Sequence, residues 1–563
     1  MIRTATLFLA TLPLLAQQAP RPSPATIQHW QDRKFGMFIH WGLYSIPAGV
    51  WNGRRIANGY SEQIESHAPI PKDDYEKLAA QFNPVKWDPD AIARLAKNAG
   101  MKFIVITAKH HDGFNMFATK QTSYNVAAAT PYHKDVVQEL SMACARNGLK
   151  FGVYYSTIDW HYPDATAWTE DNNNDIPAKH ADFNVRQLRE LMSNYGPLSE
   201  IWFDMGNPTL AQSRRFADTV HSIQPECMVS GRVFNHQGDF SVMGDNRIPQ
   251  IILDEPWQTP ASIYGETWGY REWQERGDLP GKINEHILKL VEVVSRGGNY
   301  LLNIGPRGDG SVVEFEAGVL RGVGAWLEKN GEAIYATRPQ PFRALEFGFA
   351  TVKPGRLYLM VRNWPADGLL RLPGLKNKIR KAWFLADPRR TPLHLEIADG
   401  TPAVRITQVS TRRLETAPVT VVAAEVTGDI AVTPPVIRPD SAGVITLTAA
   451  QANTWYNYNG GGYYDPPTPY KRQWDFVIAR KGQYQVEILY NQVQTGTNVE
   501  LVVDRRTIVG QIDRSSGSGS ISIGAVDLTP KDHISLSLTP PRPFAKGAAL
   551  GLDVDRVTLT PVQ

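Results

Sequence analysis

Polar and aromatic side chains close the short apolar runs in the first half of the chain, and their types are those that bind a sugar. They are His40, Trp41, His110, His111, Tyr154, Tyr155, Asp204, Arg232, Asp254 and Glu255. Aromatic rings stack on the apolar face of a sugar, whereas imidazole, guanidinium and carboxylate groups bond its hydroxyls. This combination predicts a monosaccharide pocket, provided that the fold brings the ends of these runs together.

The elements that must position these side chains alternate between two patterns from about residue 35 to residue 305. Short apolar runs predict strands at 35–42, 102–111, 150–156, 200–204, 228–232, 251–255 and 299–305. Segments of helical period predict helices at 89–98, 134–146, 178–195, 212–223, 281–295 and 313–329. No glycine-rich turn of the kind that a dinucleotide fold needs follows the first strand. The sequence therefore predicts the α/β class, as an irregular (β/α)8 TIM-like barrel with its site at the C-terminal strand ends.

The chain of 563 residues is too long for one hydrophobic core, so we expect several domains. The barrel is predicted over 25–335, a β-sandwich over 336–433 and a second β-sandwich over 434–563, because short strands with Pro and Gly turns replace the helical pattern. The second sandwich contains the aromatic stretch WYNYNGGGYY. Its tyrosines indicate either carbohydrate binding or support of the neighbouring sandwich.

The N-terminal segment 1–17 combines a basic residue with a short apolar run, which is the pattern of a secretory signal peptide. We therefore expect a secreted or periplasmic protein. The 59 basic and 56 acidic residues leave a net charge of +3, with neither sign gathered into a long run. Neither nucleic acid nor a membrane surface is expected as a partner. The only cysteines, Cys144 and Cys227, lie in separate predicted elements, so a disulfide is not indicated.

Five motifs of the chain resemble those of the α-L-fucosidases of glycoside hydrolase family 29. They are FGMFIHWGLYS, KHHDGF, GVYYS, EIWFD and SRGGNYLLNIGPRGDG, in this order across most of residues 30–335. The resemblance implies a retaining exo-hydrolase that acts by double displacement on oligosaccharides or glycoconjugates with a terminal α-L-fucose. It implies no cofactor, and it carries no information about the C-terminal module or the oligomeric state.

Carried over by position, the aspartate of EIWFD, Asp204, takes the role of the nucleophile that attacks the anomeric carbon. A role as a helix cap is disfavoured, because Thr209 is available to cap the next helix. Three histidines correspond to residues that bond sugar hydroxyls, namely His40, His110 and His111. The other positions that the resemblance places around the sugar are Trp41, Glu62, Tyr154, Trp202, Arg232 and Trp268.

The general acid/base is left open by the motifs. Some family members have a Trp-Glu pair where this chain has Trp257 and Gln258, and glutamine cannot transfer a proton. Asp245, which follows Arg232 by 13 residues, is the preferred candidate. The remaining candidates are Glu255 and Glu266. The acid must approach the nucleophile to about 5–5.5 Å and have a raised pKa.

Three alternative functions remain open at this point. Gln63 stands in GYSEQIES where the family often has tryptophan, and its amide suits an extra hydroxyl on the sugar. An α-L-galactosidase or α-L-glucosidase is therefore one alternative. A catalytically silent glycan-binding protein that has lost the acid/base is the second, and an inverting hydrolase on the same barrel is the third.

A metal site at His110 and His111 is not expected. Adjacent residues of a strand point to opposite faces, so the two imidazoles would not share one ion unless the strand had already ended. The chain also lacks the ligand spacing of a zinc site such as HExxH.

Overall fold

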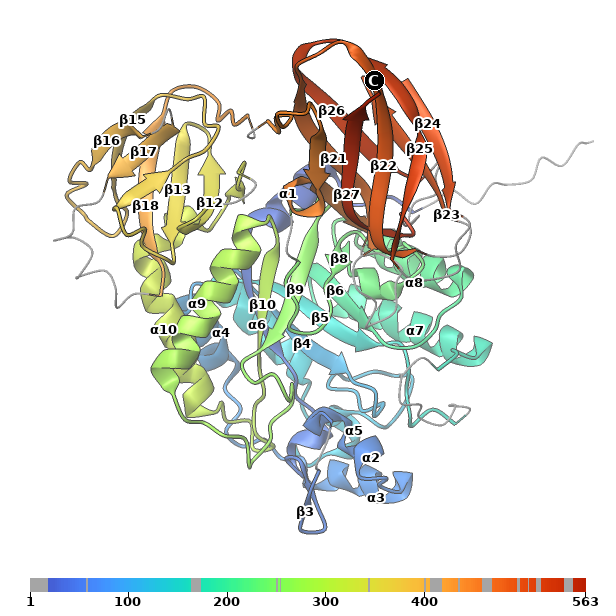
Figure 1. Ribbon diagram of the computed structural model, residues 1–563. Coiled ribbons are helices and arrows are strands. Elements are labelled where there is room, and N and C mark those ends of the chain that lie inside the picture. Colours follow the sequence, from blue (N-terminus) through green and yellow to red (C-terminus); the bar gives the residue numbers. More distant parts are fainter. Residues whose placement is uncertain are drawn as a thin grey trace, which may run out of the picture.

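The computed structural model describes residues 19–562 with several gaps (Figure 1). The residues not described within that range are 57–58, 164–173, 250–251, 254, 343–344, 399–400, 406–417, 434–435, 458–467, 494–496, 505, 513–517 and 541–549. The predicted signal peptide at 1–17, Asp254 and most of the tyrosine-rich stretch therefore lie outside the described residues.

Eight parallel strands form the central sheet of the described chain, in the order β7-β6-β5-β4-β1-β10-β9-β8. An isolated parallel bridge between Ser230 and Phe240 joins the two ends of this order, directly after β7 and before β8. The (β/α)8-like barrel is thus confirmed. Its strands are β1 (Phe35–Ile39), β4 (Phe103–Lys109), β5 (Lys150–Ser156), β6 (Leu198–Asp204), β7 (Met228–Val229), β8 (Ser241–Val242), β9 (Trp257–Ser262) and β10 (Asn299–Ile304).

Four of the six helices that cover the barrel begin at side-chain caps. Asp88, Asp135, Thr209 and Asp278 each accept a hydrogen bond from a backbone N–H of the first helical turn. The covering helices are α4 (Pro89–Asn98), α6 (Val136–Asn147), α7 (Ala178–Asn194), α8 (Leu210–Ile223), α9 (Leu279–Ser295) and α10 (Glu314–Asn330). Helix α1 (Pro24–Asp32) precedes the barrel, and the hairpin β2 (Val50–Trp51) and β3 (Arg54–Arg55) and the short helices α2 (Ile64–His67), α3 (Lys72–Glu76) and α5 (Val126–Ala129) belong to its loops. None of the described helices is both long and apolar enough to cross a membrane.

The two faces of the barrel strands pack into different clusters, as the alternation of side chains along a strand requires. One cluster lies inside the barrel and contains Phe38, Val105, Tyr154, Trp202 and Leu301, each from a different strand. The residues that alternate with them, such as Met37, Ile104, Val153, Ile201 and Leu302, pack outward in the large core beneath the helices. At the C-terminal strand ends, the residues two positions after an inward-facing one therefore point into the barrel opening.

The strand predicted at 251–255 is wrong at its described residues, 252, 253 and 255, which are not in a strand. The strand that pairs with β10 is β9 (Trp257–Ser262). Every residue of β9 is buried although Gln258, Thr259 and Ser262 are polar. Their side chains find hydrogen-bond partners inside the fold, so the strand has no apolar signature. The sequence also missed β8, which is only two residues long.

The chain after α10 forms two antiparallel modules, which Figure 1 shows as separate units on one side of the barrel. The first packs β11-β12-β13-β18-β15 against β14-β17-β16, with Leu359, Leu370 and Val404 in its core. The second packs β19-β27-β22-β25 against β20-β21-β26-β23-β24, with Trp474, Val486 and Leu501 in its core. Their strands are β11 (Arg338–Pro339), β12 (Gly348–Lys353), β13 (Arg356–Val361), β14 (Leu369–Arg371), β15 (Ile379–Phe384), β16 (His394–Ala398), β17 (Thr401–Arg405), β18 (Thr420–Val426), β19 (Ile445–Thr448), β20 (Asn453–Asn457), β21 (Thr468–Ile478), β22 (Gly482–Val493), β23 (Thr497–Val503), β24 (Arg506–Ile512), β25 (Gly519–Leu528), β26 (Lys531–Thr539) and β27 (Leu552–Pro561). The domain boundaries drawn from the sequence stay predictions.

Candidate active site

Asp204 is the last residue of β6, two positions after the inward-facing Trp202, so its carboxylate points into the C-terminal end of the barrel. Tyr154 Oη donates to Asp204 Oδ2 at 2.5 Å, and Arg232 Nη1 donates to Asp204 Oδ1 at 2.9 Å. Burial raises the pKa of the Asp204 carboxyl to about 6, and the hydrogen bonds from Arg232 and Tyr154 limit that rise. The carboxylate is therefore ionised at neutral pH and held on both oxygens.

Arg232 joins two carboxylates at this site. It lies in the 3-10 turn η4 (Gly231–Val233) that follows β7, and its Nη2 donates to Asp245 Oδ1 at 2.6 Å. The Asp245 side chain is 26% exposed, against 10% for Asp204. The two acids thus approach one guanidinium from its two terminal nitrogens, and Asp245 lies nearer to solvent. The arrangement brings together an inner ionised carboxylate and an outer one.

His40 and His111 are oriented by neighbours that leave one ring nitrogen of each facing away. Asn303 Nδ2 donates to the carbonyl of Trp268, so its Oδ1 accepts from His40 Nδ1 at 2.7 Å. Ser156 Oγ donates to a backbone carbonyl and accepts from His111 Nδ1 at 2.8 Å. Burial lowers the pKa of His40 to about 4 and that of His111 well below its usual range. Both imidazoles are neutral, with Nε2 left as an acceptor for a hydroxyl.

His110 offers an unsatisfied polar atom at the same end of the barrel. Its Nδ1 is buried and has no hydrogen-bond partner among the described residues. Its ring lies parallel to Tyr154, with centroids 5.6 Å apart, and 5.8 Å from the ring of His40. Buried polar atoms are nearly always paired, so this nitrogen indicates a hydroxyl supplied by a ligand.

A β-bulge at Ala108 explains how β4 presents these histidines. Thr107 pairs with Tyr154, but Lys109 pairs with Tyr155, so one residue of β4 is left over. The bulge turns Lys109 outward beneath α7 and His110 inward. Because the strand ends at Lys109, His110 and His111 do not take opposite faces as the sequence argument assumed, and their ring centroids are 3.8 Å apart.

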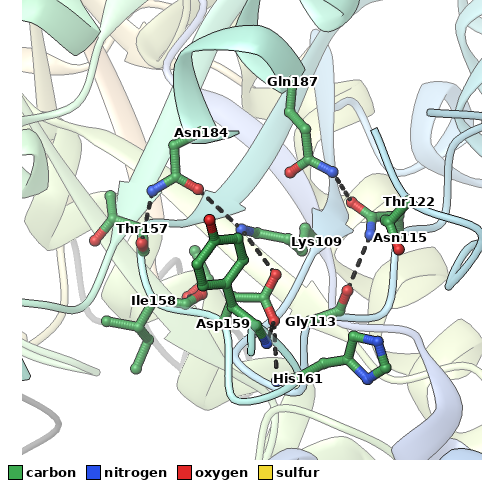
Figure 2. A network of polar contacts seen from close by, with 12 residues as sticks. Lys109, Gly113, Asn115, Thr122, Thr157, Ile158, Asp159, His161, Asn184 and Gln187 are labelled. Carbon is green, nitrogen blue, oxygen red and sulfur yellow. Dashed lines mark hydrogen bonds and ion pairs between the residues drawn. The ribbon is translucent and has the colours of Figure 1, made fainter. Parts of the chain in front are cut away.

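Lys109 directly precedes the two histidines, and Figure 2 shows its contacts with Asp159 and Asn184. Its ammonium is fully buried, lies 3.7 Å from Asp159 Oδ2 and donates to Asn184 Oδ1 at 3.2 Å. Asp159 Oδ1 accepts from the backbone N–H of His161, in the loop after β5. Gly113 passes so close that a Cβ there would lie 2.1 Å from Asp159 Oδ1. The pair therefore fastens the loops after β4 and β5 to α7.

Glu62 reaches the site from the long loop after β1. It is buried in the 3-10 turn η2 (Ser61–Gln63), and its Oε2 accepts from the backbone N–H groups of Trp268 and Gly269 at 3.1 and 2.8 Å. These bonds hold the Trp268 ring against His40, with centroids 5.2 Å apart. Burial raises the pKa of Glu62 to about 7 despite the two backbone donors, and the charge of Asp245 adds to the rise.

The structure does not bring every predicted residue to Asp204. Glu255 lies just before β9 and accepts from Ser241 Oγ, the first residue of β8, at 2.7 Å. It is therefore at the N-terminal ends of the strands, opposite to Asp204, because β9 begins at Trp257, after this residue. Glu266 is exposed in the loop after β9. The ring of Trp41 packs against Trp87 in the outer core, with centroids 4.5 Å apart.

Sequence reasoning missed three residues that orient this site. They are Asn303, Ser156 and Lys109. The polar strand ends in NYLLNIG and GVYYS were a usable signal for Asn303 and Ser156. Lys109 lacks one, because its partners come from elements distant in the sequence. The described residues hold no group of three or more His, Cys, Asp or Glu side chains that could bind a metal ion, and the absence of a metal stays a prediction.

The chain is similar to proteins of one family. Residues 16–332 match the family model described as alpha-L-fucosidase. Mouse tissue alpha-L-fucosidase is 33% identical over 381 residues, which span 63% of this chain and 81% of that protein. The human tissue enzyme is 33% identical over 377 residues, covering 62% of this chain and 78% of that protein.

Solved structures extend the similarity beyond the barrel. The alpha-L-fucosidase of Vibrio sp. strain EJY3 has a TM-score of 0.67 at 26% identity and covers 96% of this chain and 98% of its own. A family 29 alpha-L-fucosidase of Bacteroides thetaiotaomicron, trapped as a covalent intermediate with 2-fluoro-fucosyl fluoride, has a TM-score of 0.65 at 26% identity, over 74% of this chain and 100% of its own. A covalent sugar–enzyme intermediate is the mark of a retaining mechanism.

Proposed function

Because the chain belongs to the α-L-fucosidase family, glycoside hydrolase family 29, we propose that it removes terminal α-L-fucosyl residues with Asp204 as the nucleophile. One observation carries this assignment. The Asp204 carboxylate, ionised and bonded by Tyr154 and Arg232, lies at the C-terminal end of a barrel strand with Asp245 on the same guanidinium. Two carboxylates close together are the requirement of a retaining glycosidase.

In the first step, Asp204 Oδ attacks the anomeric carbon as the bond to the glycosidic oxygen breaks, and the outer acid donates a proton to that oxygen. The alcohol leaves and an ester joins the sugar to Asp204. In the second step, the same outer residue removes a proton from water, which attacks the anomeric carbon and releases Asp204 and fucose. His40, His110 and His111 bond the sugar hydroxyls through their free ring nitrogens.

The outer acid has two candidates in this geometry. Asp245 is partly exposed beside Arg232, where an incoming glycosidic oxygen and water have access. Glu62 is buried, and its pKa of about 7 keeps a proton available near neutrality. We assign the acid to Asp245, because both Glu62 Oε2 contacts hold backbone N–H groups and thereby fix Trp268.

Trapping with 2-fluoro-fucosyl fluoride tests the nucleophile. The expected result is a stoichiometric adduct whose peptide carries the label on Asp204. An adduct on any other residue would overturn the assignment. Proton NMR of the first-formed fucose separates the inverting alternative, because a retaining enzyme releases the α anomer first.

Azide rescue distinguishes Asp245 from Glu62. Asp245→Asn should lose most activity on an alkyl fucoside, keep more on a dinitrophenyl fucoside, and give α-fucosyl azide when azide is added. Glu62→Gln should show no azide product, and its defect should be similar on both substrates. Glu275→Gln, an exposed acid of the same region, serves as the control. The reverse pattern would assign the acid to Glu62.

The alternative sugar specificity rests on Gln63. Its Oε1 lies 3.1 Å from His67 Nε2, so the amide oxygen is already engaged by α2 (Ile64–His67). This contact favours fucose over a 6-hydroxylated L-sugar. The comparison of kcat/KM on nitrophenyl α-L-fucoside and α-L-galactoside decides, and a preference for the galactoside would contradict the assignment.

We also propose that the chain is exported, on the pattern of residues 1–17 alone. Expression of the full chain with N-terminal sequencing of the extracytoplasmic product tests this. The uncleaved chain retained in the cytoplasm would overturn it.

A further inference from the structure

Gln258 lies inside the barrel, fully buried, in a chain of hydrogen bonds that leads to the active site. Trp202 Nε1 donates to Gln258 Oε1 at 2.9 Å, and Gln258 Nε2 donates to Glu200 Oε1 at 3.1 Å. Trp30 Nε1 donates to the other oxygen, Glu200 Oε2, at 2.6 Å. An indole can only donate, so the amide has one permitted orientation and Glu200 must accept from both sides.

Trp202 in turn supports both groups that bond Asp204. Its ring lies parallel to Tyr154 at 19°, with centroids 5.8 Å apart, and the guanidinium of Arg232 lies 4.8 Å from its centroid. The Trp202 ring is only 1% exposed, and Phe38 closes another side of it at 5.2 Å. A rotation of this indole therefore moves the donors on both oxygens of the Asp204 carboxylate together.

We propose that Gln258 is a positioning residue of the hydrolysis, which holds Trp202 in the one orientation that keeps Tyr154 and Arg232 on Asp204. It touches neither sugar nor reacting atoms. Glu200 is the second member of this device, since it accepts the amide N–H and so prevents Gln258 from turning. The inference rests on the proposed nucleophilic role of Asp204.

The charged groups around these hydrogen bonds determine how a substitution changes the pKa of Asp204. Arg33 acts on Glu200, Glu200 in turn acts on Cys227, and burial raises the pKa of both Glu200 and Cys227. Asp204 is faced by Arg232, Tyr154 and Asp245. Loosening Arg232 and Tyr154 removes the two contacts that lower the pKa of Asp204. The fall of kcat/KM on the acid side of its pH profile, the acid limb, therefore moves to higher pH.

Two single variants break the pairing in opposite ways. Gln258→Glu places a second carboxyl group against that of Glu200. Glu200→Gln leaves one amide oxygen to accept from both Trp30 and Gln258. The double variant Glu200→Gln/Gln258→Glu restores every bond with the amide and the carboxylate exchanged: the carboxylate accepts from Trp202, and the amide donates to it and accepts from Trp30. Gln81→Glu, on an exposed surface of the barrel, is the control for the added charge.

The test is the pH dependence of kcat/KM on nitrophenyl α-L-fucoside. Each single variant is expected to move the acid limb up by about one pH unit. Because one pKa unit reflects a tenfold change in the balance between protonation states, this shift lowers kcat/KM by about twofold at pH 7 and by close to tenfold at about pH 5. The double variant is expected to return the limb to the parent position and to recover at about pH 5 to within about threefold of parent kcat/KM.

Three outcomes would overturn the proposal. They are single variants with an unmoved acid limb, a double variant no better than the poorer single, and a double variant that fails to fold by its thermal transition. If a single variant itself fails to fold, a folded double variant with the parent limb still supports the exchange. Failure of the proposed function is distinguishable, because the parent enzyme would then not be labelled on Asp204 by 2-fluoro-fucosyl fluoride.

Discussion

Tyr154 donates a hydrogen bond of 2.5 Å to Asp204 from the neighbouring strand, where Ser156 is the register partner of Asp204. The donor therefore comes from two residues earlier on β5, and its inward ring spans the offset. Burial raises the pKa of the Asp204 carboxyl, and this hydroxyl works against that effect. The relationship sets how acidic the nucleophile is, and several predictions depend on it.

Removal of the nucleophile has a distinctive chemical signature. Asp204→Gly should lower kcat/KM by about 10⁴-fold or more, as loss of a covalent catalyst does. Added azide should occupy the vacated space, attack the anomeric carbon and give β-fucosyl azide, detectable by NMR. A variant that hydrolyses the fucoside as fast as the parent would contradict the nucleophilic role.

The pH profile of the parent should show an acid limb. Asp204 acts only when ionised and its pKa is about 6, so kcat/KM should fall as the pH drops below about 6 and level off above it. The profile on an activated aryl fucoside isolates this limb, because such a leaving group needs little protonation. A limb near pH 4 would mean that burial does not act on Asp204 in the free enzyme.

Tyr154→Phe should displace that limb upward. The variant keeps the ring that packs on Trp202 but removes the hydroxyl that stabilises the carboxylate. We expect a loss of about tenfold in kcat/KM near neutrality, the size of one hydrogen bond to a charged group. Tyr155→Phe is the matched control, since Tyr155 Oη contacts α7 on the outer side of the same strand. Equal shifts in the two variants would argue against the assigned role.

The buried ion pair between Lys109 and Asp159 should be needed for stability (Figure 2). Lys109→Met leaves Asp159 without its cation, and breaking a buried pair costs about 3–5 kcal/mol. The double variant Lys109→Met/Asp159→Asn should lose less, because no uncompensated charge remains. Calorimetry of the barrel transition measures both. A double variant less stable than the single would show that the pair itself is not the reason.

Removal of metal ions should leave activity unchanged. Retaining hydrolysis needs only two carboxylates, and no group of three metal-binding side chains occurs in the described ranges. Dialysis against EDTA, followed by assay with and without added Ca²⁺ or Zn²⁺, measures this. Loss of activity that a divalent ion restores would require a metal site.

Several elements were predictable because their signals are local. Helix α4 and strand β5 have the same bounds as their predictions, since capping, helical period and apolar runs act within a few residues. Strand β9 was not predictable in this way. Its buried Gln258 is satisfied by Trp202 and Glu200, more than 50 residues away, and Thr259 and Ser262 bond backbone carbonyls outside the strand, so the strand has no apolar run that marks it.

The sequence by itself determined the barrel and the position of Asp204 at the end of a strand, because the alternation of apolar runs and helices is written into consecutive residues. Only the tertiary structure decided which groups surround that carboxylate. Arg232 links Asp204 to Asp245, Glu62 meets Trp268 across 206 residues of chain, and Glu255 lies at the opposite end of the strands. Such contacts depend on loop paths and on a one-residue bulge, and neither has a periodic signature.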